Sequence, residues 1–407
     1  MYGLLGQNLA HSLSPQIHSL FGDYPYELFC REKDELDAFF ADEKITAFNV
    51  TIPYKVEAFK RCDTVSETAK KIGSVNTVVR RSDGTLYGDN TDYFGFLKTA
   101  EKYGADFNGK KVIALGSGGA SLTVQCVVKD CGAEEVVVVS RTGENNYKNI
   151  SRHYDADIIV NTTPVGMFPN NGERLIDLSK FKKVGCVLDL IYNPMKTRLL
   201  LDADELNIPN GNGLYMLVAQ GLRSAELFFG KAFDSSLVDT AYRRIKEEQS
   251  NIVLIGMPGC GKTTVGRIIS EKLSKKFVDS DTEIEQKFQK KIPQIFTENG
   301  EEFFRKNEAE IINKIGKNLD CVIATGGGAV LKKENRDALK QNGTVVYLKR
   351  DLSELALNGR PLSNGENAVE KLYRERKGIY ESFADFTVEV KGGAEATAER
   401  VIECVSL

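Results

Sequence analysis

The sequence contains few of the residues that build metal sites or disulfide frameworks. Only three of its 407 residues are histidines, and its eight cysteines are scattered without a C-x-x-C pair. A structural zinc site needs sulfur and nitrogen ligands at close spacing, so we expect none here. Dispersed thiols are typical of proteins that stay reduced in the cytoplasm.

Long apolar runs and an excess of positive charge are lacking as well. No apolar stretch approaches the roughly 20 residues that a membrane helix needs. The opening residues MYGLLGQNLAHSLSP have no basic region followed by an apolar one. The net charge is -3, whereas a general nucleic-acid binder is usually basic. We therefore expect a cytoplasmic protein that binds neither membranes nor nucleic acids, and its oligomeric state stays open.

The length of the chain predicts several domains. A chain of 407 residues is too long for one hydrophobic core, and domains of roughly 100–200 residues predict two or three. Two segments, KKVIALGSGGAS (residues 110–121) and NIVLIGMPGCGKTT (residues 251–264), combine an apolar run, a glycine-rich turn and a helical pattern. Buried parallel strands lead into helices in this way. The charged helical stretch AYRRIKEEQS predicts a domain boundary near Glu248.

The part before this boundary divides again. Up to about Asp92, short apolar runs such as AFNVTIP and SVNTVVR alternate with helical segments. From about Lys110 to Ile191, helices or loops separate the runs KVIAL, EEVVVVS, ADIIVNT and GCVLDLI. This spacing predicts a doubly wound parallel sheet, so the fold class is α/β.

The second glycine-rich turn is a phosphate-binding loop. Residues Gly256 to Thr263 match G-x-x-x-x-G-K-[ST] at every position. Its glycines let backbone N–H groups surround a phosphate at the N-terminus of the helix. Lys262 can reach the β- and γ-phosphates, and the hydroxyl of Thr263 can bind Mg²⁺. A chance glycine turn is a poor alternative, so this part of the chain uses ATP or GTP.

Other polar residues follow the P-loop, and each has a simpler alternative. Asp279 and Asp281 end the next apolar segment, where one carboxylate can serve Mg²⁺ and the other can accept a proton; helix caps are the alternative. Arg305 and Glu308 can form a helical i, i+3 salt bridge. The glycines of ATGGGAV (residues 324–330) suit a close ligand or merely a tight turn.

Taken in order, these segments resemble shikimate kinase. The resemblance rests on the P-loop, FVDSDTEIE, GEEFFRKNE, TGGGAV, GRPL and RKGIYESFAD, and covers residues 251–407. It implies that shikimate is bound by Asp281, Arg305, Gly327 and Arg376, with the arginines on its carboxylate. It implies the catalytic residues Lys262, Asp281 and Arg360, the last from a lid that closes on ATP. It also implies ATP binding by Gly259, Cys260, Gly261, Lys262, Thr263, Thr264 and Arg360, and Mg²⁺ binding by Thr263 and, through water, Asp279. The lid stretch 351–360 is shorter than in the family and has no arginine between Arg350 and Arg360.

The first glycine-rich turn resembles a dinucleotide fingerprint. Residues 116–121 read G-x-G-x-x-S after a predicted strand. The next strand ends in Ser140-Arg141-Thr142, where an NAD site usually has an acidic residue for the ribose 2′-hydroxyl. Arg141 would pair with a 2′-phosphate, which favours NADP, although it could be a plain surface arginine.

Polar residues upstream of this turn are inconclusive one by one. Ser12 and Ser14 could bind ring hydroxyls or a carboxylate, or could cap the following helix. Lys55, just after an apolar strand, is more often a surface charge. The segments FNVTIPYK, GSVNT and GDNTDY add further polar side chains: Asn49, Thr51, Asn76 and Asp92.

Together they resemble shikimate dehydrogenase over residues 1 to about 240. The shared segments are SLSPQIH, NVTIPYK, SVNT, NTD, GSGGAS, SRT, NTTPVGM, DLIYNPMKT and GNGLYMLVAQ. The resemblance implies hydride transfer from NADPH to 3-dehydroshikimate, with Lys55 and Asp92 as the catalytic pair. It implies substrate binding by Ser12, Ser14, Asn49, Thr51, Asn76, Tyr192 and Gln220. It implies NADP binding by Glu67, Gly116, Ser117, Gly118, Gly119, Ala120, Ser140, Arg141, Thr142, Leu190 and Gly213.

Two positions depart from the dehydrogenase pattern. Tyr93 stands where the family usually has glycine after N-T-D, which could shift the backbone of Asp92. Asn145 stands where a second basic residue is common, which weakens the preference for NADP, although Lys148 could compensate.

The two resemblances predict one bifunctional enzyme. We expect a substrate-binding domain (residues 1–92 and 214–247), a Rossmann-type NADP-binding domain (93–213) and a P-loop kinase domain with a parallel sheet (251–407). It would reduce 3-dehydroshikimate to shikimate and phosphorylate shikimate to shikimate 3-phosphate, with NADP(H), ATP and Mg²⁺. Two alternatives stay open: a different cyclic polyol acid such as quinate, or one half that binds ligand without catalysis.

Overall fold

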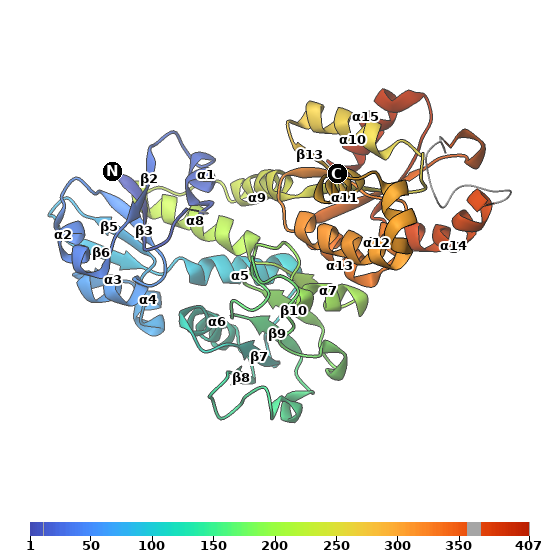
Figure 1. The fold of residues 1–407 in the computed structure, drawn as a ribbon. Coiled ribbons are helices and arrows are strands. Elements are labelled where there is room, and N and C mark those ends of the chain that lie inside the picture. Colours follow the sequence, from blue (N-terminus) through green and yellow to red (C-terminus); the bar gives the residue numbers. More distant parts are fainter. Residues whose placement is uncertain (11, 356–367, 407) are drawn as a thin grey trace. The chain divides into compact units, whose positions relative to one another are not determined.

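The computed structural model describes residues 1–10, 12–355 and 368–406, which form two compact units (Figure 1). The first unit comprises Met1–Val165, Arg174–Tyr192 and Asp202–Ile245. The second comprises Lys246–Leu407 together with two earlier segments, Gly166–Glu173 and Asn193–Leu201. Within the described ranges, no helix is long and apolar enough to cross a bilayer.

The first unit begins with a mixed six-stranded sheet in the order β2-β1-β3-β5-β6-β4. Strand β1 pairs in parallel with β2 and β3, whereas β5 runs antiparallel to both of its neighbours, β3 and β6. Phe29, Phe39 and Phe48 are buried in the core of this sheet. The strands are β1 (Tyr2–Gly6), β2 (Tyr26–Cys30), β3 (Ala47–Val50), β4 (Thr64–Val65), β5 (Thr77–Arg80) and β6 (Leu86–Asp89).

Helices from both ends of the first unit accompany this sheet. Helix α8 comes from much later in the chain and packs against α1, α5, β3 and β5. The helices are α1 (Ser14–Ser19), α2 (Leu36–Ala41), α3 (Lys55–Arg61), α4 (Glu67–Ile72), α5 (Asp92–Tyr103), α8 (Leu214–Phe229) and α9 (Ser236–Gln249), with the 3₁₀ turn η1 (Lys33–Glu35). The division between the units falls inside α9, after Ile245.

The second sheet of the first unit is fully parallel, in the order β11-β10-β9-β7-β8. Its inner strands are buried on both faces, which explains why they read as continuous apolar runs. The elements are β7 (Lys111–Leu115), α6 (Gly119–Asp130), β8 (Glu135–Val139), η2 (Ile150–His153), β9 (Ile158–Asn161), η3 (Leu178–Lys180), β10 (Cys186–Asp189), α7 (Arg198–Glu205) and β11 (Asn210–Gly211). The predicted parallel sheet is confirmed.

The second unit contains a parallel sheet in the order β13-β14-β12-β15-β16. Its strands are β12 (Asn251–Ile255), β13 (Lys276–Asp279), β14 (Cys321–Ala324), β15 (Gly343–Lys349) and β16 (Phe386–Glu389). Its helices are α10 (Lys262–Leu273), α11 (Ser280–Phe288), α12 (Ile292–Gly316), α13 (Lys333–Lys340), α14 (Ala368–Phe383) and α15 (Gly393–Val405), with η4 (Ala329–Leu331) and η5 (Leu352–Glu354). The predicted α/β class is confirmed for both units.

The two earlier segments are tied to the end of α13 within the second unit. The side-chain oxygen of Asn342 accepts the N–H of Met195 at 2.9 Å, and the carbonyl of Gln341 accepts the N–H of Lys196 at 2.8 Å. Arg198 forms an ion pair with Asp337. The sequence did not predict these contacts, because the segments lie about 140 residues before their partners.

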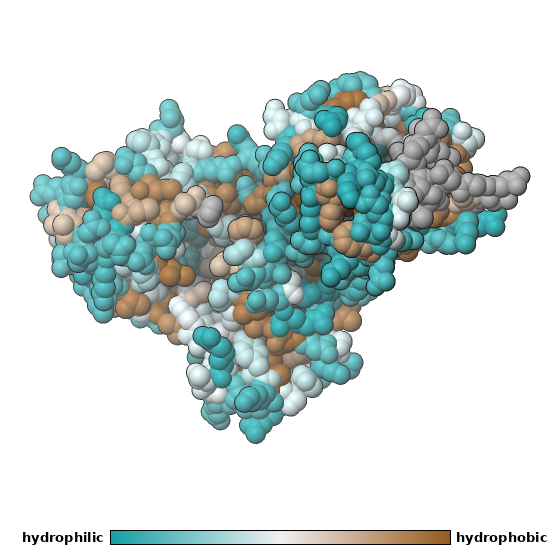
Figure 2. Space-filling view, viewed as in Figure 1, coloured by the Kyte–Doolittle hydropathy of each residue, from teal (hydrophilic) through white to brown (hydrophobic). Residues whose placement is uncertain are grey.

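Polar side chains cover much of the visible surface of each unit, and apolar ones are scattered among them (Figure 2). Two exposed apolar residues lie in the segment around Lys55: Ile52 is 79% exposed and Val56 is 50% exposed. Since Lys55 is a predicted catalytic residue, this apolar surface borders the region described next.

Candidate active sites

Lys55 and Asp92 meet directly in the first unit. The ammonium nitrogen of Lys55 lies 2.5 Å from a carboxylate oxygen of Asp92, and the two side chains are 29% and 15% exposed. Lys55 is the first residue of α3 and Asp92 the first of α5. The pair is therefore fixed by two helix starts and still open to solvent.

The sheet explains why such distant residues gather. Because β5 is antiparallel to β3 and β6, its beginning lies beside the ends of both neighbours. Thr51 directly follows β3, Asn76 directly precedes β5, and Asp92 lies three residues beyond the end of β6. Three of the predicted site residues thus share one edge of the sheet.

A buried hydrogen-bond network supports this edge. The side-chain oxygen of Asn49 accepts the hydroxyl of Tyr26 at 2.7 Å, and its amide nitrogen donates to Ser224 at 2.7 Å. The side-chain oxygen of Asn76 accepts the N–H of Thr91 at 2.7 Å. Asn49 therefore uses both ends of its amide on protein groups. Tyr26 and Ser224 were not predicted, because strand β2 and the middle of α8 carry no local signal of a site.

The other predicted substrate residues lie around this network. The hydroxyl of Ser12 donates to that of Ser14 at 3.2 Å. Leu13, not either serine, is the N-cap of α1. Gln220 accepts a long bond of 3.4 Å from Thr91. Tyr192 is partly enclosed, and burial raises the pKa of its hydroxyl.

The turn between β7 and α6 fits a dinucleotide phosphate. Gly116 has φ +109°, and a Cβ there would lie 2.7 Å from the hydroxyl oxygen of Thr162. At Gly118 and Gly119 an added Cβ would meet no described atom within 4 Å, so a ligand can approach the backbone. Ser117 and Ala120 are exposed as well. The free N–H groups at the start of α6 suit an anion.

The turn after β8 presents Arg141 and Thr142 to solvent. It is closed by two bonds of Ser140, whose N–H donates to the carbonyl of Asn145 at 3.1 Å and whose hydroxyl accepts the N–H of Gly143 at 3.0 Å. The side chain of Asn145 is engaged with His153 at 2.9 Å. Lys148 is exposed. Arg141 and Lys148 are therefore both presented to solvent, whereas Asn145 is held by His153.

The remaining predicted cofactor residues differ in their surroundings. A Cβ at Gly213 would lie 2.0 Å from the carbonyl oxygen of Leu190, so these two backbones touch and only glycine fits. Glu67 starts α4, is 84% exposed and pairs with Lys70 at 2.6 Å. Helix α4 itself packs against α6.

The P-loop joins β12 to α10 in the second unit. Gly256, Gly259 and Gly261 have φ values of +143°, +82° and +103°, which other residues rarely adopt. Lys262 is buried, and its ammonium donates to the carbonyls of Gly256 at 2.9 Å and Met257 at 3.0 Å. The loop thus holds its cation with its own carbonyls. Cys260 is buried beneath it, and Thr264 is exposed.

The two carboxylate oxygens of Asp279 have different partners, one for each of its two expected roles. One carboxylate oxygen caps α11 by accepting the N–H of Asp281 at 3.0 Å. The other accepts the hydroxyl of Thr263 at 2.7 Å. A hydroxyl beside a carboxylate is an all-oxygen donor set of the kind that Mg²⁺ prefers. The capping alternative and the metal role are therefore compatible.

The three glycines of the TGGGAV turn each accommodate a different group. An added Cβ would lie 2.5 Å from a carboxylate oxygen of Asp281 at Gly326, 2.7 Å from the ring of Pro258 at Gly327, and 2.3 Å from the guanidinium of Arg305 at Gly328. A larger residue at any of these positions would displace the group that lies against it. The turn thus lies against Asp281, Arg305 and Pro258, the last of which belongs to the P-loop.

Arginines and one glutamate are enclosed beside this turn. Arg305 pairs with Glu308 at 2.7 Å and with Glu301 at 3.2 Å. Burial raises the pKa of Glu308 against the opposing pull of Arg305. Arg376 is 3% exposed, and its buried Nε has no hydrogen-bond partner among the described residues. Tyr380 donates its hydroxyl to the carbonyl of Gly327, a contact that the sequence did not predict.

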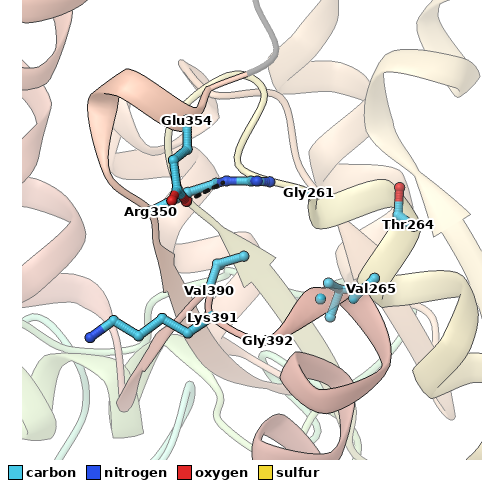
Figure 3. Close-up of a pocket in the computed structure, with 10 residues that line it drawn as sticks. Gly261, Thr264, Val265, Arg350, Glu354, Val390, Lys391 and Gly392 are labelled. Atoms are coloured by element: carbon cyan, nitrogen blue, oxygen red, sulfur yellow. Dashed lines mark ion pairs between the residues drawn. The ribbon is translucent and has the colours of Figure 1, made fainter.

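A cavity of about 700 Å³ adjoins the P-loop (Figure 3). Gly261 and Thr264 line it, as expected for an ATP site, and so do Arg350, Lys391 and Gly392 from the ends of β15 and β16. Figure 3 shows Arg350 paired with Glu354 across the cavity from Thr264. The sequence did not predict Arg350, Lys391 and Gly392 as site residues, because they belong to loops without a recognisable pattern. Arg360 lies outside the described residues.

Comparison with known proteins shows the family of the larger part of the chain. Residues 4–78 match the family model for the shikimate dehydrogenase substrate binding domain. A shikimate dehydrogenase (NADP(+)) of Clostridium perfringens is 35% identical over 267 residues, which cover 60% of this chain and 98% of that protein. The chain belongs to the shikimate dehydrogenase family. The resemblance predicted from nine sequence segments is thereby confirmed.

Solved structures of shikimate dehydrogenases agree with this assignment. A chorismate mutase/shikimate 5-dehydrogenase fusion protein of Clostridium acetobutylicum is 37% identical, with a TM-score of 0.58 over 60% of this chain and 97% of that one. A shikimate 5-dehydrogenase of Thermus thermophilus, solved with NADP(H) and shikimate, is 31% identical, with a TM-score of 0.54 over 60% and 98%.

The rest of the chain supplies the second activity. Residues 258–406 match the family model for shikimate kinase. The chain is therefore a bifunctional enzyme, a shikimate dehydrogenase followed by a shikimate kinase, as the sequence predicted. The alternative of a half without catalysis is not supported.

Proposed function

We propose that the chain reduces 3-dehydroshikimate to shikimate with NADPH and then phosphorylates the hydroxyl that the reduction creates. The observation that carries this proposal is the coexistence of two site geometries in one chain. The first is the Lys55–Asp92 pair, 2.5 Å apart. The second is the glycine turn that joins Asp281 and Arg305 to the P-loop.

Lys55 is the proposed acid of the reduction. NADPH supplies the hydride to the ring ketone. As negative charge grows on the ketone oxygen, the ammonium of Lys55 donates its proton there. Asp92 holds the ammonium in place through their direct contact. Ser12, Ser14, Thr51, Asn76, Tyr192 and Gln220 are the proposed substrate contacts, and Asn49 supports them from behind.

The cofactor of the reduction is NADP(H), as in the curated dehydrogenases that this chain resembles. The open turn at Gly118 and Gly119 accepts the pyrophosphate, and the exposed Arg141 pairs with the 2′-phosphate. Because Asn145 is turned toward His153, we propose that Arg141 carries most of the preference for NADP over NAD.

Asp281 is the proposed base of the phosphorylation. It accepts the proton of the attacking hydroxyl, while Arg305 and Arg376 pair with the carboxylate of shikimate. The buried, unpartnered Nε of Arg376 supports a role that awaits a ligand. Lys262 exchanges its bonds to Gly256 and Met257 for bonds to the phosphates of ATP. Thr263 and, through water, Asp279 would hold Mg²⁺, which would neutralise phosphate charge when bound.

Two further expectations belong to this proposal. All eight cysteine thiols are free, which is what a reducing compartment maintains, so we place the enzyme in the cytoplasm. Its substrates are small molecules, and an oligomer stays compatible with the described surface.

Parallel assays on the full chain test the proposal. NADPH oxidation should be fast with 3-dehydroshikimate and slow with 3-dehydroquinate, and phosphoryl transfer from ATP to shikimate should stop when EDTA removes Mg²⁺. Faster turnover of the quinate-type substrate would overturn the substrate assignment. Phosphorylation that resists EDTA would overturn the metal assignment.

Lys55→Met should lower reductase kcat by about 10²–10⁴, the usual contribution of a positioned acid. The matched control is Lys60→Met, which removes a lysine that is 62% exposed on the same helix. Equal losses in the two variants would contradict the role of Lys55.

A further inference from the structure

Tyr93, which replaces the usual glycine of the family, has a specific partner in this structure. Its hydroxyl donates to a carboxylate oxygen of Asp130 at 3.1 Å, and its ring packs against the core below β7 and α6. Asp130 is the last residue of α6, whose first residues form the proposed phosphate site. Tyr93, the residue directly after Asp92, therefore links the start of α5 to α6, the proposed cofactor-binding helix.

Asp130 has a second partner on the other side. Lys71 of α4 donates to both of its carboxylate oxygens, at 2.8 Å and 3.1 Å. Helix α6 packs against both α4 and α5, so the three side chains bridge three helices at one point. We name Lys71, Asp130 and Tyr93 the Asp130 bridge.

Helix α4 is also tied to the other side of the catalytic aspartate. Ser66, the N-cap of α4, donates its hydroxyl to Asp89 at 2.5 Å. The short segment 89–93 is thus held before Asp92 through Ser66 and after it through Tyr93. Both attachments lead to α4, and only the second passes through α6.

We propose that Tyr93 and Asp130 are positioning residues for hydride transfer. The Asp130 bridge sets the place of the Lys55–Asp92 pair relative to the helix that binds NADPH. This inference rests on the proposed role of Asp92. Neither Tyr93 nor Asp130 is among the proposed substrate or cofactor contacts. Their loss should change the geometry of the reacting atoms and leave the two binding surfaces intact.

The test compares Tyr93→Phe, Asp130→Asn and the double variant in the full chain. Each should lower reductase kcat about threefold to fivefold, the worth of one partly exposed hydrogen bond. KM for 3-dehydroshikimate and for NADPH should stay within about twofold, because each substrate keeps its own contacts. The double variant should be no slower than Asp130→Asn, since both changes break the same bridge.

A deuterium isotope effect separates positioning from a general loss of active protein. With NADPH deuterated at the transferred hydrogen, the isotope effect on kcat should rise in the bridge variants, because a poorly placed hydride makes its transfer slower. The matched control is Tyr103→Phe, which removes a hydroxyl from the same helix that contacts Tyr242 at 3.2 Å. It should leave the isotope effect unchanged.

Three results would overturn the proposal: an unchanged kcat, a lower kcat with an unchanged isotope effect, or the same rise in Tyr103→Phe. Reduction of 3-dehydroshikimate by the unmodified chain and its loss in Lys55→Met are measured first. Their failure would reject the proposed function, whereas the bridge variants test only the positioning role.

Discussion

The turn from β7 to α6 and the turn from β12 to α10 are built alike, although we propose different ligands for them. Each follows an inner parallel strand, and each starts with a glycine of positive φ, Gly116 at +109° and Gly256 at +143°. The first turn carries no charged side chain and offers backbone N–H groups and the hydroxyl of the exposed Ser117 to an anion. The second also carries Lys262, which bonds the loop's own carbonyls.

The two turns differ in where the positive charge for a phosphate group lies in the chain. The P-loop has its cation within the turn, so one short segment predicts its ligand. No charged side chain lies in the dinucleotide turn, and the proposed cation for this site, Arg141, follows the end of the neighbouring strand β8. On the proposed assignment, discrimination between NADP and NAD depends on the parallel pairing of β7 and β8, which sets the two turns side by side.

Among the changes that compare the two units, removing the cation of the P-loop should give the largest effect. Lys262→Met should lower kinase kcat by about 10²–10³, as loss of one charged donor to the transition state does, and should leave reductase activity unchanged. Lys272→Met is the control, since this lysine lies on the same helix and pairs with Glu395 at 2.8 Å. Loss of both activities in Lys262→Met would show that the two sites are not independent.

The next largest effect should come from lowering the pH, which should decrease the stability of the first unit. Both histidines that the structure describes, His18 and His153, belong to the first unit, and burial lowers the pKa of His18 from 6.5 to about 3. Its contribution to stability is present above pH 6.5 and is lost as the pH falls toward 3. Between pH 7 and pH 5 the first unit should lose about 2 kcal/mol from this residue, whose unfolded form gains a proton.

Thermal unfolding followed at several pH values measures this loss. His18→Phe keeps a ring stacked against Tyr26, whose centroid is 4.0 Å away, and removes the titration. That variant should be less sensitive to acid than the natural chain. An identical pH dependence would contradict the assignment.

Removing Arg141, the proposed cation of the dinucleotide site, should have a smaller effect. Arg141→Ala should raise KM for NADPH about tenfold, the worth of one charge-assisted contact at an exposed site. KM for NADH should hardly change, because NADH lacks the 2′-phosphate. Arg152→Ala, a basic residue farther along the same half, is the control. Equal changes for both cofactors would reject Arg141 as the selective residue.

The smallest expected effect concerns the segments that join the second unit. Asn342→Ala removes the acceptor of the Met195 N–H and should cost the second unit about 1 kcal/mol. Lys340→Ala, which breaks an ion pair with Asp385 in the same region, is the control. Backbone amide exchange at residues 195–196 should quicken in the first variant alone. Unchanged exchange would mean that this contact does not hold the segment.

The sequence predicted those features that depend on local pattern. Strands β7, β8, β9 and β10 were expected from runs of buried branched residues, and both glycine turns from their spacing. The Lys55–Asp92 pair was expected from the family resemblance, and the structure adds its direct contact. Local pattern and the segments shared with the two families therefore predicted the fold class and most of the candidate site residues.

Contacts between distant elements escaped prediction. Tyr26 and Ser224 meet Asn49 only because β2 and α8 are brought to the same sheet. Tyr380 reaches Gly327 across 53 residues, and its Arg-x-x-x-Tyr spacing with Arg376 shows only that both share a helix face. Side chains of this kind carry no signal of their own, because their partner is chosen by tertiary packing.

The most direct test supplies the full chain with 3-dehydroshikimate, NADPH and Mg-ATP and follows both NADPH and shikimate 3-phosphate. The account predicts that phosphorylated product appears only when both NADPH and ATP are present, and that its amount never exceeds the NADPH consumed. NADPH loss without shikimate 3-phosphate, or ATP-dependent product without NADPH, would contradict it.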